Sequence, residues 1–287
     1  MKVSIIGYGF VGSALEKALI NVEKCVIDPK FNTEIEDLRG FNPDIIFICV
    51  PTPMGNNGSQ DLTIATKVLK NIKKLSLQSL VVMKSSIVPS KAKEMSSIID
   101  RFVYNPEFLR EKHALEDFIN SELILFGGQE THCKQLADFY SKHTICKSKS
   151  YSFTDVICAS LCKYTINSFL ATKVIFFNQI RDVFDESGTN EEWNNFTKIL
   201  SKDTRIGNSH MSVPGHDGRK GFGGACFPKD TSALLNYSKS INEEFKLLKK
   251  VIKFNNIIRV DYNELTNREK EQKVSFKYNK QKDTGES

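Results

Sequence analysis

A cysteine lies within a glycine-rich stretch at residues 221–230, which reads Gly-Phe-Gly-Gly-Ala-Cys-Phe-Pro-Lys-Asp. The glycines before Cys226 allow the backbone to approach a ligand closely and to adopt positive φ angles. Pro228 suits the first turn of a helix, and Asp230 would fall in the same turn. A helix N-terminus and the neighbouring Lys229 both favour a thiolate over a thiol. The pattern predicts a nucleophilic cysteine, and a buried structural cysteine is the alternative.

A second glycine-rich stretch, Gly7-Tyr-Gly-Phe-Val-Gly12, follows a short apolar run and precedes an amphipathic segment. In a strand–turn–helix context the first glycine makes the tight turn and the second lets the backbone meet a pyrophosphate. The third permits close packing of helix on strand. Asp28 ends the next expected strand, where it would bind ribose hydroxyls and disfavour a 2′-phosphate. The motif therefore predicts NAD rather than NADP; a purely structural glycine turn is the alternative.

Two further pairs of polar residues have the spacing of one helix face. Lys163 and Asn167 are four residues apart in an apolar helical segment. A lysine in such surroundings should be paired or functional, unless it extends to the surface. Glu107 and Glu111 are also four apart, at the start of an expected helix. Their alternative role is to complement the helix dipole.

The first half of the chain alternates apolar strands with amphipathic helices, which must position these residues. Helices are expected up to about residue 20 and at 61–75, 89–99 and 129–142. Strands are expected at residues 2–6, 24–28, 44–50, 80–84, 101–104, 122–126 and 144–146. This order predicts an α/β fold, a Rossmann-like doubly wound sheet over residues 1–150 with ligand loops at one edge.

The second half has a helical pattern. Residues 153–186 contain no glycine or proline and have apolar residues at helical spacing, which predicts one long helix ended by Ser187-Gly188. This helix is apolar on more than one face, so we expect it to be buried, partly against a second subunit. Shorter helices are expected at 191–200, 229–239 and 244–258. An all-α central domain would span residues 151–262, and the polar, lysine-rich residues 263–287 predict a disordered tail.

Composition narrows the classes of function. The 287 residues are 40% hydrophobic and 26% charged, which excludes global disorder and allows two domains. The net charge of +6 suits an anionic ligand, but no dense basic patch with aromatics predicts nucleic-acid binding. The seven cysteines have no disulfide or metal-ligand spacing, so no metal is expected. Without a signal-peptide pattern or an apolar run that spans a bilayer, we expect a cytoplasmic protein with no membrane contact.

In combination, these stretches resemble the UDP-glucose/GDP-mannose dehydrogenase family, the nucleotide-sugar 6-dehydrogenases. The matching motifs, in the family's order, are Gly7-Tyr-Gly-Phe-Val-Gly12, Val50-Pro-Thr-Pro53, Lys84-Ser-Ser86, Asn105-Pro-Glu-Phe-Leu-Arg-Glu111, Lys163-x-x-x-Asn167, Asn178, Arg205-Ile-Gly207 and Gly221-Phe-Gly-Gly-Ala-Cys-Phe-Pro-Lys-Asp230. The two most specific are residues 105–111, the glutamate motif, and residues 221–230, the cysteine motif. Ser86 stands where the family usually has threonine, which keeps the hydroxyl. The resemblance covers residues 1–258.

The resemblance implies NAD-dependent oxidation of the C6 alcohol of a nucleotide sugar, with UDP-glucose as the expected substrate. Cys226 would form a thiohemiacetal with the aldehyde and then a thioester, and Glu107 would activate the water that hydrolyses the thioester. Lys163 would stabilise an oxyanion, Asn167 would hold the reacting carbon or a water, and Asp230 would orient the site. A homodimer through the long helix is also implied.

The resemblance also implies two sets of binding residues. Those expected to contact NAD are Gly7, Gly9, Phe10, Val11, Gly12, Asp28, Pro51, Thr52, Ser86, Glu111 and Lys229. Those expected to contact the substrate are Phe108, Leu109, Arg110, Lys163, Asn167, Arg205 and Gly223. Among these, Arg205 would reach the sugar bound to a neighbouring subunit.

Family members carry another α/β domain that binds much of the nucleotide, and this chain is expected to lack it. Two alternatives to the dehydrogenase therefore stay open. One is a remnant that binds NAD and dimerises without catalysis. The other is a two-electron dehydrogenase of the 3-hydroxyacid or 6-phosphogluconate type, which shares the Lys-x-x-x-Asn pair but needs no nucleophilic cysteine.

Overall fold

The computed structural model describes residues 1–262 and 264–276, in two compact units. The first comprises residues 1–52 and 60–163, and the second comprises residues 53–59 and the described residues from 164 onward. The division between the units falls inside the long helix rather than at residue 150. It also assigns the short loop at 53–59 to the second unit.

The first unit is built on a seven-stranded sheet of order β2-β1-β3-β4-β5-β6-β7. All neighbouring strands are parallel except β5 and β6, which are antiparallel. The strands are β1 (Lys2–Ile6), β2 (Glu23–Ile27), β3 (Ile45–Ile48), β4 (Leu80–Met83), β5 (Phe102–Tyr104), β6 (Leu125–Gly128) and β7 (Ser152–Thr154). The strand order reverses between β1 and β3, the point where such sheets bind ligands.

The strand expected at residues 144–146 is wrong. Within the described residues, Thr144 makes only an isolated bridge with Leu19, and the last strand of the sheet lies later, at β7. The hydroxyl of Thr144 donates to the carbonyl of Tyr140 and accepts from the N–H of Cys146. These local bonds close the turn after the preceding helix and replace a sheet ladder.

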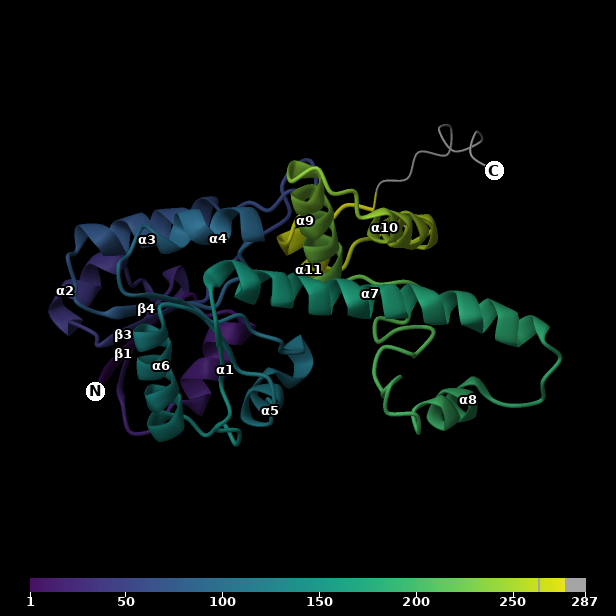
Figure 1. Cartoon of the computed structure of the whole chain (residues 1–287), viewed down its shortest axis with the longest axis horizontal. Coiled ribbons are helices and arrows are strands. Elements are labelled where there is room, and N and C mark those ends of the chain that lie inside the picture. Colours follow the sequence, from purple (N-terminus) through teal and green to yellow (C-terminus); the bar gives the residue numbers. More distant parts are fainter. Residues whose placement is uncertain (263, 277–287) are drawn as a thin grey trace. The chain divides into compact units, whose positions relative to one another are not determined.

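Helices cover both faces of this sheet (Figure 1). On one face lie α1 (Phe10–Ala18), α5 (Ala114–Ile119) and α6 (Glu130–His143), and on the other lie α2 (Leu38–Phe41), α3 (Thr63–Lys74) and α4 (Pro89–Ser96). Short 3-10 helices occur at η1 (Pro29–Phe31), η2 (Ile35–Asp37) and η3 (Glu111–His113). A hydrophobic core lies on each face of the sheet. Alternate residues of β3 point into them, Ile45 and Phe47 on one face and Ile46 and Ile48 on the other. The doubly wound α/β fold is therefore confirmed.

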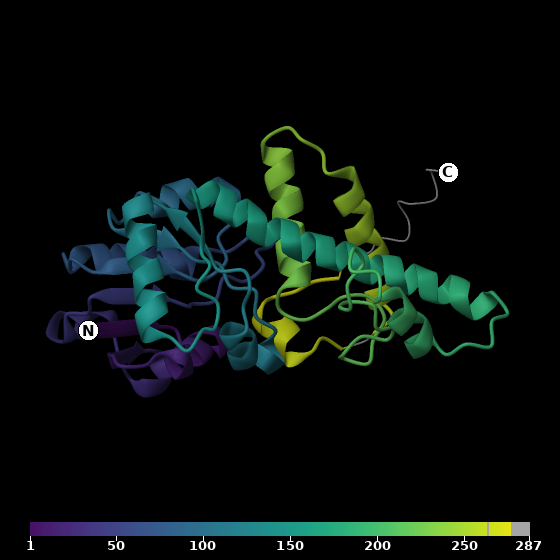
Figure 2. The same cartoon turned by 60° about the horizontal axis from the view of Figure 1, so that its bottom comes forward.

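Helices form the second unit. The long helix α7 (Val156–Glu186) is confirmed at 31 residues, and Gly188 follows it with a φ of +73°. The other helices are α8 (Trp193–Leu200), α9 (Phe227–Ser240), α10 (Lys246–Arg259) and α11 (Asn267–Glu271). Figure 2 shows α9 and α10 side by side as a yellow-green pair. Trp193 and Phe196 of α8 pack on α7 residues Phe177 and Phe184, which forms a separate small core.

The expected disorder from residue 263 onward is wrong for residues 264–276. Thr266 caps α11 through a reciprocal capping box with Glu269, and both Glu269 and Val274 are buried. This polar sequence is ordered because the buried carboxylate of Glu269 accepts hydrogen bonds from the N–H groups of Thr266 and Gly224. Residues 263 and 277–287 of the expected tail lie outside the described residues. In the part of the chain that the structure describes, no helix is long and apolar enough to cross a membrane.

Candidate active site

The glycine turn after β1 is shaped by close packing. Gly7 has a φ of +93°, and a Cβ on it would lie 2.7 Å from the carbonyl oxygen of Cys49. A Cβ on Gly12 would lie 2.0 Å from the oxygen of Gly7. By contrast, no described atom comes within 4 Å of a Cβ built on Gly9. Gly7 and Gly12 are thus required by the fold, while Gly9 leaves backbone open to a ligand.

The same turn fits the diphosphate and ribose of NAD. Gly9 is the N-cap of α1, and no side chain among the described residues caps this helix, so its first N–H groups can face an anion. Asp28 lies at the end of β2, where its carboxylate accepts from the N–H of Tyr8 at 2.6 Å. The acid is therefore held beside the glycine turn, as ribose binding requires. Phe10 and Val11 open α1.

The loops after β3 and β4 are tied to each other within the first unit. The hydroxyl of Ser85 donates to the carbonyl of Val50 at 2.7 Å, and the Gln60 amide donates to the carbonyl of Ser86 at 2.8 Å. Thr52 is buried at this edge, and Pro51 beside it is exposed. These bonds give the expected NAD residues of the two loops a fixed backbone.

A buried ion pair joins the glutamate motif to the long helix. Lys163 is only 3% exposed, so it does not extend to the surface. Its Nζ donates to the Glu107 carbonyl at 2.5 Å, lies 3.4 Å from Glu107 Oε1 and lies 5.2 Å from the centre of the Phe108 ring. The other carboxylate oxygen of Glu107 accepts from the N–H of Leu109 at 2.8 Å. A carboxylate and a cation are thus held together with little solvent around them.

The neighbouring residues of the motif are less enclosed. Arg110 is exposed and forms an ion pair of 2.6 Å with Asp117. Glu111, expected near NAD, begins the 3-10 helix η3 and is exposed. The expected roles of both residues stay predictions.

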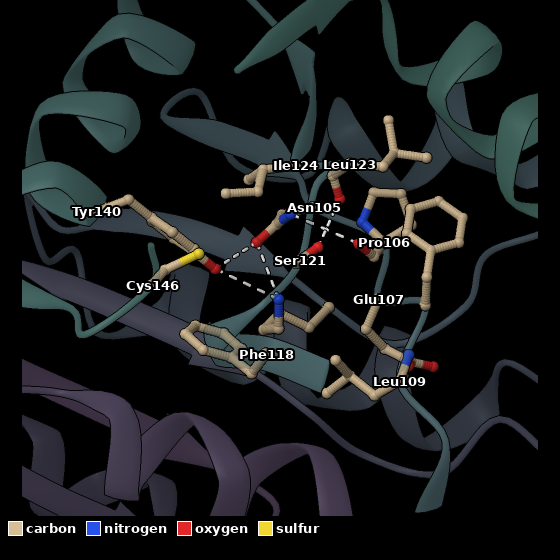
Figure 3. A pocket seen from close by; sticks show the side chains of 12 residues that line it. Asn105, Pro106, Glu107, Leu109, Phe118, Ser121, Leu123, Ile124, Tyr140 and Cys146 are labelled. Carbon is tan, nitrogen blue, oxygen red and sulfur yellow. Dashed lines mark hydrogen bonds between the residues drawn. The ribbon is translucent and has the colours of Figure 1, made fainter. Parts of the chain in front are cut away.

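A buried lysine to which the sequence analysis gave no role, Lys84, is bonded to this motif through Asn105. Figure 3 shows the pocket that contains Asn105 and Tyr140. Nζ of Lys84 donates to Oδ1 of Asn105 at 2.9 Å, and the Tyr140 hydroxyl donates to the same oxygen at 2.6 Å. Burial lowers the pKa of Lys84. These residues line a pocket together with Glu107 and Leu109. Because Asn105 begins the Asn-Pro-Glu segment, the network fixes the backbone that carries Glu107.

In the second unit, Cys226 is half-buried at the N-cap of α9, with Pro228 in the first turn, as predicted. The Cys226 carbonyl accepts from the N–H of Asp230 at 2.8 Å. The Asp230 side chain is 0% exposed and binds two partners, Nδ2 of Asn167 at 2.6 Å and Nζ of Lys229 at 2.5 Å. Asp230 therefore fixes Asn167 and neutralises Lys229. The expected contact of Lys229 with NAD stays a prediction.

The backbone of the cysteine loop, residues 221–226, is held by side chains from distant segments. Gly221 N–H donates to Asn178 Oδ1 at 2.9 Å, and its carbonyl accepts from Arg259 Nη2 at 2.9 Å. Asn255 binds both polar groups of the Phe222 backbone, at 2.7 and 3.0 Å. Gly221 and Gly224 have φ angles of +72° and +75°, so they adopt the positive values expected of them.

Sequence reasoning missed three of the side chains that hold this loop, Asn255, Arg259 and Glu269. Asn255 and Arg259 are four residues apart on an otherwise apolar helix face, the same signal that singled out Lys163 and Asn167. Glu269 belongs to a Thr-x-x-Glu capping box inside the supposed tail. Arg205, by contrast, has a side chain that is 88% exposed and pairs with Asp203.

Comparison with known proteins gives the family. Residues 21–144 match the model of the UDP-glucose/GDP-mannose dehydrogenase family, NAD binding domain, and residues 158–257 match its central domain. UDP-glucose 6-dehydrogenase TuaD of Bacillus subtilis is 34% identical over 83% of this chain and 52% of its own length. UDP-glucose 6-dehydrogenase of Rhizobium meliloti is 30% identical over 89% of this chain and 67% of its own length.

Solved structures agree on the fold. A UDP-glucose dehydrogenase from the hyperthermophilic archaeon Pyrobaculum islandicum matches with a TM-score of 0.72 at 26% identity, over 89% of this chain and 68% of its own. A 3-hydroxyisobutyrate dehydrogenase of Mycobacterium tuberculosis has a TM-score of 0.68 at 14% identity, over 92% and 95% of the two chains, which is a likeness of fold alone. The chain spans about half the length of curated relatives such as the Bacillus protein. From its matched domains, the chain belongs to the UDP-glucose/GDP-mannose dehydrogenase family and comprises that family's NAD-binding and central domains.

Proposed function

We propose that this chain oxidises the C6 alcohol of a UDP-sugar, with UDP-glucose as the expected substrate, to a carboxylate. The observation that carries the proposal is the position of Cys226, a half-buried thiol at the start of α9 in a loop whose backbone is held on several sides. A simple alcohol dehydrogenase has no use for such a group. NAD, when bound, would accept a hydride (two electrons and one proton) at each of the two oxidations, with one further proton released.

Cys226 acts between the two oxidations. Its thiolate adds to the C6 aldehyde and forms a thiohemiacetal, which the second oxidation converts to a thioester. Water then attacks the thioester, which releases the carboxylate and returns the thiol. Covalent capture of this kind divides a difficult reaction into easier steps.

The buried pair of the first unit supplies a base and a cation. Glu107 takes a proton from the water that attacks the thioester, and Lys163 stabilises the oxyanion that develops on C6. Their contact of 3.4 Å supports these roles, because it keeps the base and the cation next to each other. In the second unit, Asp230 accepts from the amide of Asn167, and Asn167 helps to hold the reacting carbon or a water.

The test is the number of NADH molecules formed for each UDP-glucose consumed. We expect two for the wild-type chain, with UDP-glucuronate as product. The Cys226→Ser variant should stop after the first oxidation, while Cys158→Ser, which changes an exposed cysteine, should behave as wild type. One NADH per substrate, or turnover of a 3-hydroxy acid instead, would favour the two-electron dehydrogenase. NAD binding without NADH from any UDP- or GDP-sugar would favour the non-catalytic remnant.

The proposal includes a homodimer formed through α7. Phe169, Phe176 and Val183 are spaced by seven residues along the helix, and they are 66%, 57% and 65% exposed. Large apolar side chains at this spacing form one stripe, which is typical of a helix-to-helix contact. A second copy presents the same stripe, so a twofold pairing covers both. The exposed Arg205 would then be available to the neighbour's substrate.

Light scattering tests the dimer. Phe176→Asp should convert it to a monomer at micromolar concentration. Leu247→Asp, which changes an exposed apolar residue on α10, should leave the dimer intact. A wild-type chain that is monomeric under these conditions would contradict this part of the proposal.

A further inference from the structure

The segment at residues 264–276, which follows α10, packs against the cysteine loop inside the second unit. It contains α11, whose Glu269 is 0% exposed. A buried carboxylate is costly unless it is paired and hydrogen-bonded. Here it has such partners, and one of them belongs to the loop.

The bonds of Glu269 connect this segment to the loop backbone. Oε1 accepts from the N–H of Gly224 at 3.0 Å, and Oε2 accepts from the N–H of Thr266 at 2.7 Å. Nη1 of Arg259 lies 3.9 Å from Oε1 and donates to Asp217. The same guanidinium holds the carbonyl of Gly221. One carboxylate and one guanidinium thus hold both ends of the Gly221–Gly224 backbone.

The fit between carboxylate and loop leaves no room for a side chain. A Cβ on Gly223 would lie 2.3 Å from Oε1 of Glu269 and 2.7 Å from Nη1 of Arg259. A glycine is therefore favoured at this position for a reason other than ligand approach, because a Cβ would collide with the Glu269 carboxylate.

The segment also holds a second loop, at residues 53–59. The N–H of Met54 donates to the carbonyl of Gln272 at 3.0 Å, just after α11. The side chain of Asn236, on α9, donates to the carbonyl of Asn57 at 3.0 Å. Residues 264–276 therefore contact both the cysteine loop and the loop at residues 53–59.

We infer that Glu269 is a positioning residue for Cys226. It fixes the Gly224 amide, two residues before the nucleophile, and so sets the path of the backbone that delivers the thiol. This inference rests on the proposed function, but its physical content is the rigidity of the cysteine loop, which can be measured without turnover.

The experiment compares two acidic residues of α11. Glu269→Ala removes the carboxylate that accepts from Gly224, whereas Glu269→Gln keeps an oxygen that can accept from the same amide. Glu271→Ala is the matched control, because Glu271 is on the same helix but exposed, where it pairs with Arg268. If Glu269→Ala does not fold, Thr266→Ala loosens α11 by removing its cap while leaving the carboxylate in place.

Three readouts are taken on the full chain. Hydrogen exchange of residues 221–226 and the rate at which iodoacetamide alkylates Cys226 both report on the loop alone. The kcat and KM for NADH formation with UDP-glucose report on its use. We expect Glu269→Ala to speed exchange at least about ten-fold, to change the alkylation rate by several-fold and to lower kcat by about ten- to hundred-fold. The KM for NAD should stay within about two-fold, because the NAD-binding domain is untouched.

The variants should differ in how closely their exchange rates and kcat match those of the wild type. Glu269→Gln should recover most of the wild-type exchange and kcat, and Glu271→Ala should match wild type throughout. Wild-type exchange and alkylation in folded Glu269→Ala, or in Thr266→Ala where that variant replaces it, would overturn the inference. Equal effects of Glu269→Ala and Glu271→Ala would also overturn it. If the wild-type chain forms no NADH, the proposed function fails, and the exchange and alkylation results still decide the role of Glu269.

Discussion

The glycine turn at residues 7–12 and the cysteine loop at residues 221–226 are similar in sequence but are held in different ways. Both are rich in glycine and both lead into a helix. The glycine turn is held mainly by the backbone of adjacent strands, since Gly7 donates to Ile27 and packs on Cys49, and the Asp28 carboxylate adds one side-chain contact. The cysteine loop is held by the side chains of Asn178, Asn255, Arg259 and Glu269, which come from three helices.

This difference predicts which substitutions destabilise each region. A turn held by backbone packing tolerates changes in distant side chains but not an added atom at its own glycines. A loop held by distant polar side chains is sensitive to substitutions far along the chain, because each one leaves a buried backbone group without its partner.

The largest effect is expected for Gly12→Ala in the glycine turn. Its Cβ would lie 2.0 Å from a backbone oxygen, so the variant should lose about 4 kcal/mol of unfolding free energy. Gly9→Ala is the matched control, since the described structure leaves open space there. That variant should keep its stability and bind NAD more weakly. Thermal unfolding and calorimetry measure the two effects, and equal stabilities of both variants would contradict the packing argument.

A smaller effect is expected for Asn255→Ala in the cysteine loop. The substitution leaves both polar groups of the buried Phe222 backbone without their partner, which should cost about 2 kcal/mol. It should also speed hydrogen exchange across residues 221–226. Asn194→Ala, at an exposed position of α8, should change stability by less than about 0.5 kcal/mol. Unchanged exchange in Asn255→Ala would show that the loop is rigid without this side chain.

The smallest effect concerns the reactivity of three thiols, those of Cys49, Cys133 and Cys226. Burial raises the pKa of Cys49, beneath the glycine turn, to about 12, and raises that of Cys133 to about 11. A raised thiol pKa means that the protonated form persists as pH rises, so neither residue should be alkylated in the folded chain at pH 8. Cys226, half-buried in its loop, should react. Peptide mapping after brief alkylation measures this, and early labelling of Cys49 would contradict the raised pKa of its thiol.

Regular patterns in the sequence were sufficient to predict most of the elements. The period of apolar residues indicated the long helix α7 and most strands, and Pro228 correctly placed Cys226 at a helix start. These features depend on neighbours a few residues apart. The strand expected at 144–146 failed because Thr144 makes local hydrogen bonds that a count of apolar residues does not register.

The sequence by itself determined which chemical groups are present. These are a glycine turn for a dinucleotide, a cysteine at the start of a helix, and a lysine in surroundings too apolar for full solvation. Only the tertiary structure decided which groups hold these residues in place. Glu269 bonds to Gly224 across 45 positions of sequence, and Lys84 reaches Tyr140 across 56. A buried polar group requires a partner, but the partner's place in the chain is set by packing. For that reason a segment that reads as a polar tail became part of the support for the cysteine.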